Sequence, residues 1–505
     1  MAQRKAELIQ SRLDKLQRIR SRGVNPYPAR YLCSHTTQEA ITLYRESRVE
    51  GSGIPEQIVS RAKRLQTLKL AGRITAMRSM GKAIFLDIRD GSGKVQAYLQ
   101  RDAIGEEKYS LLQDFDIGDF IGVEGELFET RAGEITVKVS DFTMLSKSLQ
   151  PLPEKWHGLA DVEKRYRQRY LDLLSNEQVR RTFEVRSQAI SAMRRFLEKR
   201  GFIEVETPVL QSLAAGALAR PFATHHHALD SDLYLRIATE LHLKRLIIGG
   251  FDRVYEIGRI FRNEGISTKH NPEFTTLESY QAYADYHDVM EMVEQMVSFI
   301  AKEVLGTMRI SFGELTVDLS PPWQRLTLRE AIKEGSGVDF EAFPDARSLE
   351  AEIRKTGLRV EEGMSWGKLV DYLLSHTVEP NLIQPTFLMD YPVKLSPLAK
   401  RKPGCDHLVE RFEAFAGGME IANAFSELND PLEQRERFEE QERVRALFGD
   451  EEAERIDEDF LLALEHGMPP TGGLGMGVDR LVMLLTGHQS IREVILFPQL
   501  RTVPG

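Results

Sequence analysis

Residues 256–283, EIGRIFRNEGISTKHNPEFTTLESYQAY, decide the fold, because two alternating stretches flank a polar, turn-rich segment. The alternation on each side of segment 262–272 predicts two antiparallel strands joined by a long charged loop. Period-two geometry places four side chains of the second strand on one face, namely Phe274, Thr276, Glu278 and Tyr280. This face, beside a loop carrying Arg262, Glu264 and His270, makes a poor core and a good pocket for a charged, flat ligand.

The same stretch resembles motif 2 of class II aminoacyl-tRNA synthetases, an FRxE loop between long antiparallel strands. Its wider wording, FRNEGIS-KHNPEFT-LE-Y-AYADY, is similar to the lysyl-tRNA synthetases of the bacterial type, and the resemblance extends over nearly the whole chain. It implies an α+β protein, with an N-terminal OB-fold β-barrel and a class II catalytic domain on an antiparallel sheet flanked by helices. FRxE alone would be a weak match, whereas about twenty residues in register are a specific one.

Composition is that of a soluble globular protein, with 505 residues, 28% charged and 42% hydrophobic, enough for two or three domains. The charged start MAQRKAELIQ and the lack of long apolar runs predict neither a signal peptide nor a membrane span. Cys33 and Cys405 lack metal spacing and fit a reducing cytosol. The formal charge of −9 argues against a wholly basic surface, although residues 1–23 are locally basic and 427–459 acidic.

We expect four parts: an N-terminal helical extension (1–66), an OB-fold domain (67–146), a linker and dimer-contact segment (147–182) and a catalytic domain (183–505) with an insertion at about 307–385. Hydrophobic spacing from Leu8 to Ile19 predicts a helix over 2–22. Its many arginines and lysines are either a solvated face or phosphate contacts, and we favour a helix that docks and stays basic.

Five short β-rich runs punctuated by glycines between residues 68 and 145 predict a small oligonucleotide-binding barrel. Phe85 and Gln96, expected to be exposed on neighbouring strands, would supply a stacking surface and a base-edge partner. The pattern alone leaves it open that Phe85 is core. The resemblance implies that Phe85 stacks on an anticodon base, with Arg78, Gln96 and Glu134 nearby.

Pro151 and Pro153 mark the start of the linker, whose wording PLPEKWHGLADVEKRYRQRYLDL is a family signature. A long helix from 183 and an alternating stretch at 202–210, expected to be a strand, resemble class II motif 1, which implies a homodimer interface.

A small-residue turn and three adjacent histidines, 225–227, follow. Adjacent histidines on a strand do not share a face, so a metal site is not favoured there. Glu240 is either a carboxylate at a pocket edge or a helix N-terminal acid; the resemblance implies that Glu240 and Gly216 bind the α-amino group of the amino acid. Ala215 and His227 depart from the family, which usually has Gly and Asn there.

Ala416-Gly417 suits a two-residue hairpin turn, which would place Glu413 directly opposite Glu420. Facing carboxylates destabilise a ladder unless a cation lies between them, and oxygen ligands suit Mg²⁺; two solvated carboxylates are the alternative. The resemblance favours the metal, with more than one Mg²⁺ per subunit.

Glycines 473, 475 and 477 lack a βαβ context, so they are not a dinucleotide fingerprint. The helix expected at 478–485 places Arg480 in its first turn, as in class II motif 3.

The resemblance further implies that lysine and ATP form lysyl-adenylate, and that the lysyl group then passes to tRNA(Lys), in the cytoplasm and without a membrane. The residues it assigns to ATP are Arg262, Glu264, His270, Asn271, Phe274, Glu413 and Arg480. Those it assigns to lysine are Gly216, Glu240, Arg262, Glu278, Tyr280, Asn423, Phe425 and Glu427. Arg262 and Arg480 would act on the phosphates during catalysis.

Three alternatives remain. An aspartyl- or asparaginyl-type relative would need a cationic or neutral side-chain pocket, against which Glu278 and Glu427 argue. An enzyme that lysylates proteins would resemble the catalytic domain alone. A non-enzymatic RNA-binding paralogue would be expected to lose motif residues, and all are present.

Overall fold

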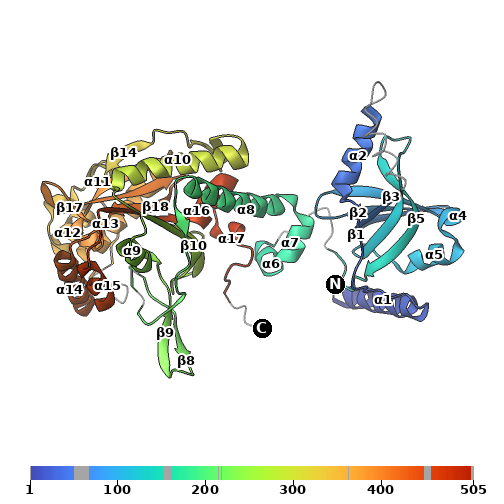
Figure 1. The fold of residues 1–505 in the computed structure, drawn as a ribbon, viewed down its shortest axis with the longest axis horizontal. Helices are drawn as coiled ribbons and strands as arrows, with labels where there is room; N and C mark the ends of the chain where they lie inside the picture. The colour runs from blue at the N-terminus through green and yellow to red at the C-terminus, as the bar shows by residue number, and fades with distance from the viewer. Residues whose placement is uncertain are drawn as a thin grey trace. The chain divides into compact units, whose positions relative to one another are not determined.

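The computed structural model describes residues 2–49, 67–152, 161–213, 215–217, 219–361, 363–448 and 456–501. The chain forms two compact units, Met1–Gly158 and Leu159–Gly505 (Figure 1). The expected boundary at Pro153 and part of the linker signature lie outside the described residues. No helix within the described ranges has the length and apolarity that a membrane span requires.

The first unit contains a closed five-stranded barrel in the order β1-β2-β3-β5-β4, as the glycine-punctuated runs predict. Its strands are β1 (Leu68–Met80), β2 (Ala83–Arg89), β3 (Lys94–Gln100), β4 (Phe120–Glu129) and β5 (Ile135–Ser146). Its helices are α1 (Ala2–Ser21), α2 (Thr37–Val49), α4 (Arg101–Ile104), α5 (Glu106–Leu111) and the 3₁₀ turn η2 (Leu112–Asp114). Alternate residues of every strand fill one apolar core.

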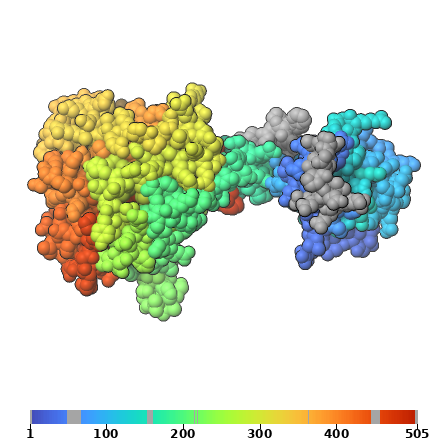
Figure 2. All heavy atoms as spheres, turned by 45° about the horizontal axis from the view of Figure 1, so that its top comes forward, coloured from blue at the N-terminus to red at the C-terminus, as the bar shows by residue number. Residues whose placement is uncertain are grey.

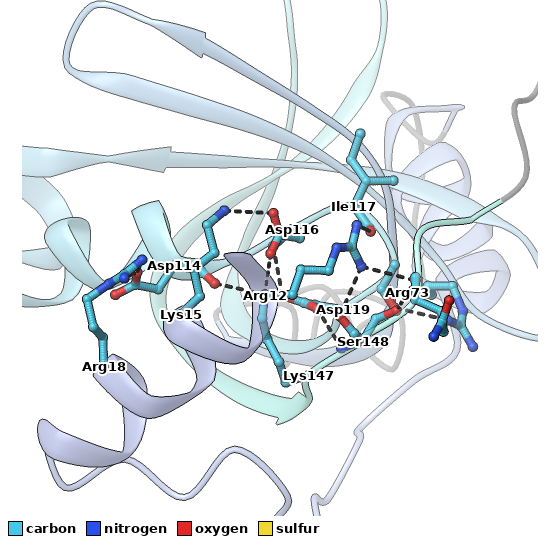
Figure 3. A network of polar contacts seen from close by, with 12 residues as sticks. Arg12, Lys15, Arg18, Arg73, Asp114, Asp116, Ile117, Asp119, Lys147 and Ser148 are labelled. Carbon is cyan, nitrogen blue, oxygen red and sulfur yellow. Dashed lines mark hydrogen bonds and ion pairs between the residues drawn. The ribbon is translucent and has the colours of Figure 1, made fainter. Parts of the chain in front are cut away.

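Helix α1 docks on the barrel through charges as well as through the buried Leu16 and Ile19. Figure 3 shows Arg12, Lys15 and Arg18 reaching from α1 to oxygens of the barrel unit. Arg12 donates to the Ile117 and Ser148 carbonyls, Lys15 lies 2.7 Å from Asp116, and Arg18 lies 2.9 Å from Asp114. Much of the basic character of α1 therefore serves attachment, while Arg4, Lys5 and Arg20 remain exposed.

The second unit is built on a nine-stranded sheet in the order β14-β15-β17-β18-β19-β11-β10-β6, with β16 beside β17. The strands are β6 (Ile203–Glu204), β10 (Arg253–Phe261), β11 (Glu273–Ala282), β14 (Gln324–Thr327), β15 (Thr386–Pro392), β16 (Arg401–Lys402), β17 (Cys405–Ala416), β18 (Met419–Ser426) and β19 (Thr471–Gly477). Pairing is antiparallel except at the two edges, β14–β15 and β10–β6. The predicted β10–β11 pair is confirmed, with Glu256 opposite Glu278.

One face of this sheet is covered by helices that form the main core (Figure 1). They are α8 (Glu177–Glu198), α10 (Tyr286–Leu305) and α16 (Val478–Thr486). Alternation along β11 buries Leu277 in this core and turns Glu278 to the opposite face, which stays open to ligands.

The remaining elements surround this frame. The short helices are α6 (Val162–Arg167), α7 (Arg169–Ser175), α9 (Glu240–Ile248), α15 (Glu458–Glu465) and α17 (Ile491–Val494), with the longer α14 (Pro431–Phe448). The segment expected to be an insertion holds β12 (Arg309–Phe312), β13 (Leu315–Asp318), α11 (Leu328–Ser336), α12 (Ala346–Lys355), α13 (Trp366–Leu373) and the sheet's edge strand β14. Strands β8 (Ala223–His226) and β9 (Ser231–Leu235) form a hairpin that protrudes from this unit, in green in Figure 2.

The three histidines lie in this hairpin, where His225 contacts Asp232 at 2.8 Å. Across the described part of the chain, no group of three His, Cys, Asp or Glu side chains has an arrangement that could hold a metal ion. The hairpin therefore gives no support to a metal site at 225–227.

Two predictions from the sequence are wrong, one of a strand and one of a hairpin turn. The stretch 202–210 forms only β6 and, after a break, β7 (Leu210–Gln211), because β6 finds just two partners on β10 and β7 pairs with β9 instead. The β17–β18 turn is Gly417-Gly418, at φ +63° and +71°, because a turn with two central residues at positive φ favours glycine at both. With a bulge after Ala414, Glu413 faces Asn423 and not Glu420.

Candidate active site

The open face of the second unit's sheet holds a cavity of about 470 Å³. Strands β11, β18 and β19 contribute its residues, together with the 262–271 loop, the start of α9 and the 395–399 segment. Every residue that the sequence assigns to ATP, lysine or metal lines this cavity, namely Gly216, Glu240, Arg262, Glu264, His270, Asn271, Phe274, Glu278, Tyr280, Glu413, Glu420, Asn423, Phe425, Glu427 and Arg480. Glu413 and Glu420 line the same cavity although they are not paired, because Glu420 lies opposite Phe415, two residues from Glu413 on the same face of β17.

Arg262 is the cation with the most available donors in the cavity. Its guanidinium makes one long hydrogen bond, 3.4 Å to the Ile237 carbonyl, and lies 5.3 Å from the centre of the Phe274 ring. It forms no ion pair within the described ranges. Burial lowers the pKa of Arg262 from its ordinary value, yet an arginine stays charged, so it is ready for an anionic ligand.

Arg480 lies in the first turn of α16 and donates to Glu420, at 2.9 Å to both the carboxylate and the carbonyl. His270 accepts or donates at 3.0 Å to Ser267, and burial followed by the charge of Arg480 lowers the pKa of its imidazole. Asn271 is buried and its amide bridges the Glu273 carbonyl and the Gln499 N–H. Asn271 thus ties the loop to the C-terminal segment, a structural task beside its predicted ligand contact.

Glu413 and Glu420 are partly neutralised by arginines. Glu413 accepts from Arg411 at 2.5 Å and from the Tyr391 hydroxyl at 2.8 Å. Burial raises the pKa of Glu413 to about 7, and the negative charge of Glu420 adds to the rise. Two neighbouring carboxylates repel each other, and their oxygens are ligands that suit a divalent cation.

The cavity is also lined by three buried carboxylates, Glu240, Glu278 and Glu427. Glu278 accepts from the Thr239 N–H at 3.2 Å, and burial, followed by the charge of Glu240, raises its pKa to about 7. Burial raises the pKa of Glu427 well above its ordinary value. Such a cluster is stable only with cations or protons to balance it.

One counter-charge is Lys244, which the sequence analysis did not single out. Its side chain is fully buried, with Nζ 2.5 Å from Glu240 and ion-paired to Glu427. The i,i+4 spacing of Glu240 and Lys244 on a helix was the available signal, but it is typical of surface pairs and does not indicate a pocket.

Gly473 makes room for the cluster. A Cβ added to this residue would lie 1.8 Å from Glu427 Oε1 and 2.7 Å from the Tyr280 ring. Glycine is needed here because neighbouring side chains fill the space that a side chain would take.

Three of the predicted anticodon-binding residues, Arg78, Phe85 and Gln96, lie on the adjacent strands β1, β2 and β3, and Glu134 lies in the loop before β5. Phe85 lies opposite Arg78 on β1 and Tyr98 on β3, half-buried on the outer surface, with its ring 4.9 Å from Tyr98. The expected exposure of Gln96 is wrong: it is 5% exposed, and its amide donates to Glu134 and accepts from Thr136. Pairing of β3 with β5 places Thr136 directly beside it, which covers the side chain.

Comparison with known proteins matches both units. The family described as tRNA synthetases class II (D, K and N) matches residues 161–501, and the OB-fold nucleic acid binding domain matches residues 68–145. The chain belongs to the class II tRNA synthetases (D, K and N). An OB-fold and a class II sheet flanked by helices, as in this family, confirm the predicted fold class.

Individual relatives cover almost the full chain. The lysine–tRNA ligase of Dehalococcoides mccartyi is 60% identical over 97% of this chain and 96% of its own length. The lysine–tRNA ligase of Moorella thermoacetica is 54% identical over 98% of both chains, and that of Shouchella clausii is 51% identical over 98% and 97%. This class II synthetase is therefore similar to lysine–tRNA ligases from end to end.

Proposed function

We propose that the protein is a lysine–tRNA ligase that activates L-lysine with ATP and transfers it to the 3′ end of tRNA(Lys). The observation that carries this is the cavity's polarity. The cavity is lined by the guanidinium of Arg262, which has one long hydrogen bond, and by three buried carboxylates, two of which share Lys244 as their partner. A ligand with anionic groups at one end and ammonium groups at the other fits this distribution, and the relatives named lysine–tRNA ligase support it.

In the activation step, the α-carboxylate of lysine attacks the α-phosphorus of ATP, and pyrophosphate leaves. Arg262 holds the carboxylate and the α-phosphate in line, so catalysis is mainly positioning and charge stabilisation. Phe274 stacks on adenine, while Glu264, His270 and Asn271 frame the nucleotide. Arg480 holds the γ-phosphate, for which it exchanges its present partner Glu420.

The amino acid is held by the carboxylate end of the cavity. Glu240 and the Gly216 backbone receive the α-ammonium group, with Asn423 and Phe425 lining the path of the side chain. Glu278, Tyr280 and Glu427 surround the ε-ammonium group. In the second step, a ribose hydroxyl at the tRNA 3′ end attacks the carbonyl, and AMP leaves.

Mg²⁺ is the proposed metal, held by Glu413 and Glu420, with further ions on the phosphates. The two carboxylates fit it, because both line the same cavity, and burial, with the charge of Glu420, raises the pKa of Glu413. When bound, Mg²⁺ neutralises charge on the pyrophosphate leaving group.

We also propose a homodimer that works in the cytoplasm. Apolar side chains are exposed on the segment after α8, namely Ile203 (50%), Val209 (40%) and Leu210 (47%). A second copy of the chain would cover them.

Amino-acid-dependent ATP–pyrophosphate exchange tests the function. Across all twenty amino acids with Mg²⁺, we expect exchange with lysine alone. Exchange with aspartate or asparagine would contradict the assignment of the side-chain pocket while leaving the fold intact. No exchange with any amino acid would favour an RNA-binding paralogue without enzymatic activity.

Replacing Phe85 by alanine should reduce kcat/KM for tRNA by roughly 5- to 150-fold, because stacking of a base on an aromatic ring contributes about 1–3 kcal/mol. The effect should be confined to tRNA, since Phe85 lies on the barrel. Aminoacylation at varied tRNA concentration measures it, and unchanged lysine-dependent exchange is the internal control. An equal loss in both assays would mean that Phe85 is needed for folding and not for tRNA.

A further inference from the structure

Lys244 is a buried cation behind the wall of the cavity. Its side chain is 0% exposed on α9, and it is not among the residues that line the cavity. Its ammonium group lies 2.5 Å from Glu240 and pairs with Glu427, while the rings of Phe425 and Phe460 lie at 5.6 and 5.9 Å. Among the described residues that line the pocket, Lys244 forms ion pairs with these two carboxylates and lies over the ring of Phe425.

The carboxylate cluster of Glu240, Glu278 and Glu427 carries more negative charge than Lys244 alone can balance. Glu240 and Glu427 pair with Lys244, whereas Glu278 accepts from the Thr239 N–H and feels the charge of Arg262. When all three carboxylates are ionised, their negative charge exceeds that of the Lys244 ammonium by two. Neither oxygen of Glu427 has a hydrogen bond of ordinary geometry within the described residues, although one pairs with Lys244. The pocket therefore has capacity for two further cationic groups, the number that a diamino acid carries on its α- and side-chain nitrogens.

We propose that Lys244 is a positioning residue that orients Glu240 and Glu427 and sets the charge of the pocket, so that the pocket selects an amino acid with a second ammonium group. The inference rests on the proposed lysine pocket and adds a residue to it. Lys244 does not touch the substrate; it acts through the carboxylates that do.

Lys244 orients the carboxylates and sets the charge of the pocket through the same group, its buried ammonium. Burial works against the charge of Lys244, but Glu240 and Glu427 raise its pKa above the ordinary value, so it stays protonated. Burial, with the charges of Glu240 and Glu278, raises the pKa of Glu427, and the charge of Lys244 opposes this rise. The other ionisable groups facing the cluster are Tyr280 and, across the cavity, Arg262. Without Lys244, the carboxylates would hold protons to higher pH, and a lysine ammonium would have to displace them.

Lys244→Met removes the charge and keeps the length of the side chain. In lysine-dependent ATP–pyrophosphate exchange by the full chain, we expect KM for lysine to rise on the order of 30-fold, with KM for ATP and kcat changed little. The acidic limb of kcat/KM for lysine should move to higher pH. A purely structural role would not move this limb.

Arg245→Met is the matched control. Arg245 is the next residue on α9 and pairs with Asp457 and Asp459 at 3.1 and 3.0 Å, away from the pocket carboxylates. Its loss should leave KM for lysine and the pH profile unchanged. If Lys244→Met behaves like Arg245→Met, the proposal is overturned.

A double variant keeps the test decisive if Lys244→Met does not fold. Lys244→Met with Glu240→Gln removes one charge of each sign and is compared with Glu240→Gln alone. We expect the double variant to show the higher KM for lysine and the shifted acidic limb, because Glu427 still loses its partner. Identical behaviour of the two would overturn the role of Lys244. Separately, an unchanged KM for lysine in Glu427→Gln would overturn the lysine pocket itself.

Discussion

Replacing Arg262 by alanine should lower kcat for lysine-dependent ATP–pyrophosphate exchange about 10³-fold, the scale at which a single arginine stabilises a phosphoryl-transfer transition state. Its donors face the cavity with one long bond to the Ile237 carbonyl, so they are available to the carboxylate and α-phosphate together. Charge develops at this point in the transition state, which is why the loss should fall on kcat more than on KM. Steady-state exchange at varied ATP and lysine separates the two.

Arg259→Ala is the control for this variant. Arg259 lies on β10, three residues before Arg262, but is exposed and pairs with Glu273 at 3.5 Å. Loss of an exposed ion pair costs little, so kcat should stay within about twofold of the original. A similar fall in both variants would mean that the strand, and not the guanidinium of Arg262, is responsible.

Replacing Glu427 by glutamine should raise KM for lysine on the order of 10²- to 10³-fold and leave KM for ATP unchanged. An amide of the same shape cannot balance a buried ammonium. Truncating one partner of a buried charge pair costs about 2–5 kcal/mol, and each ~1.4 kcal/mol is a factor of ten. Lysine titration in the exchange assay, with folding checked by thermal unfolding, measures the effect.

The exposed Glu439→Gln variant provides the comparison, since Glu439 pairs only loosely with Arg443 at 3.8 Å on α14. It should match the original protein. If Glu427→Gln instead weakened ATP and lysine equally, Glu427 would have to lie at the nucleotide end of the cavity.

The sequence predicted strands best where one face of the sheet is buried and the other face carries polar side chains. Along β11, Leu277 belongs to the core while Glu278 lines the cavity, so a period of two was visible in the residue types. The same principle gave the five barrel strands. In both cases the local pattern and the tertiary environment agree.

Predictions failed where pairing depended on distant or unusual backbone. The β17–β18 register followed from taking Ala416-Gly417 as the turn, whereas two positive φ angles place it at Gly417-Gly418. Glu413 and Glu420 nevertheless line the same cavity, because Glu420 lies opposite Phe415, two residues along β17 from Glu413. The short β6 depends on its parallel partner β10, which alternation within 202–210 does not reveal.

Buried polar side chains were the least predictable. Gln96 is covered because Thr136 lies beside it, forty residues away in sequence. Lys244 was not singled out, because its i,i+4 spacing from Glu240 is typical of a surface ion pair and nothing in the local pattern shows that Glu427 approaches it from another element. Knowledge of the three-dimensional arrangement was needed to find both.

Strand β19 shapes the part of the cavity beside Glu427 through a residue that has no side chain, Gly473. Its glycine at 473 leaves backbone beneath the carboxylate cluster, and the volume of the missing methyl group is already occupied by Glu427 and Tyr280. The depth of the cavity at this point is thus set by a residue that has no side chain of its own. Variants that accept a shorter or longer amino acid should therefore be easier to obtain by substitutions in β19 than by substitutions of the charged residues. The number of charged residues is fixed by the charges that they must balance.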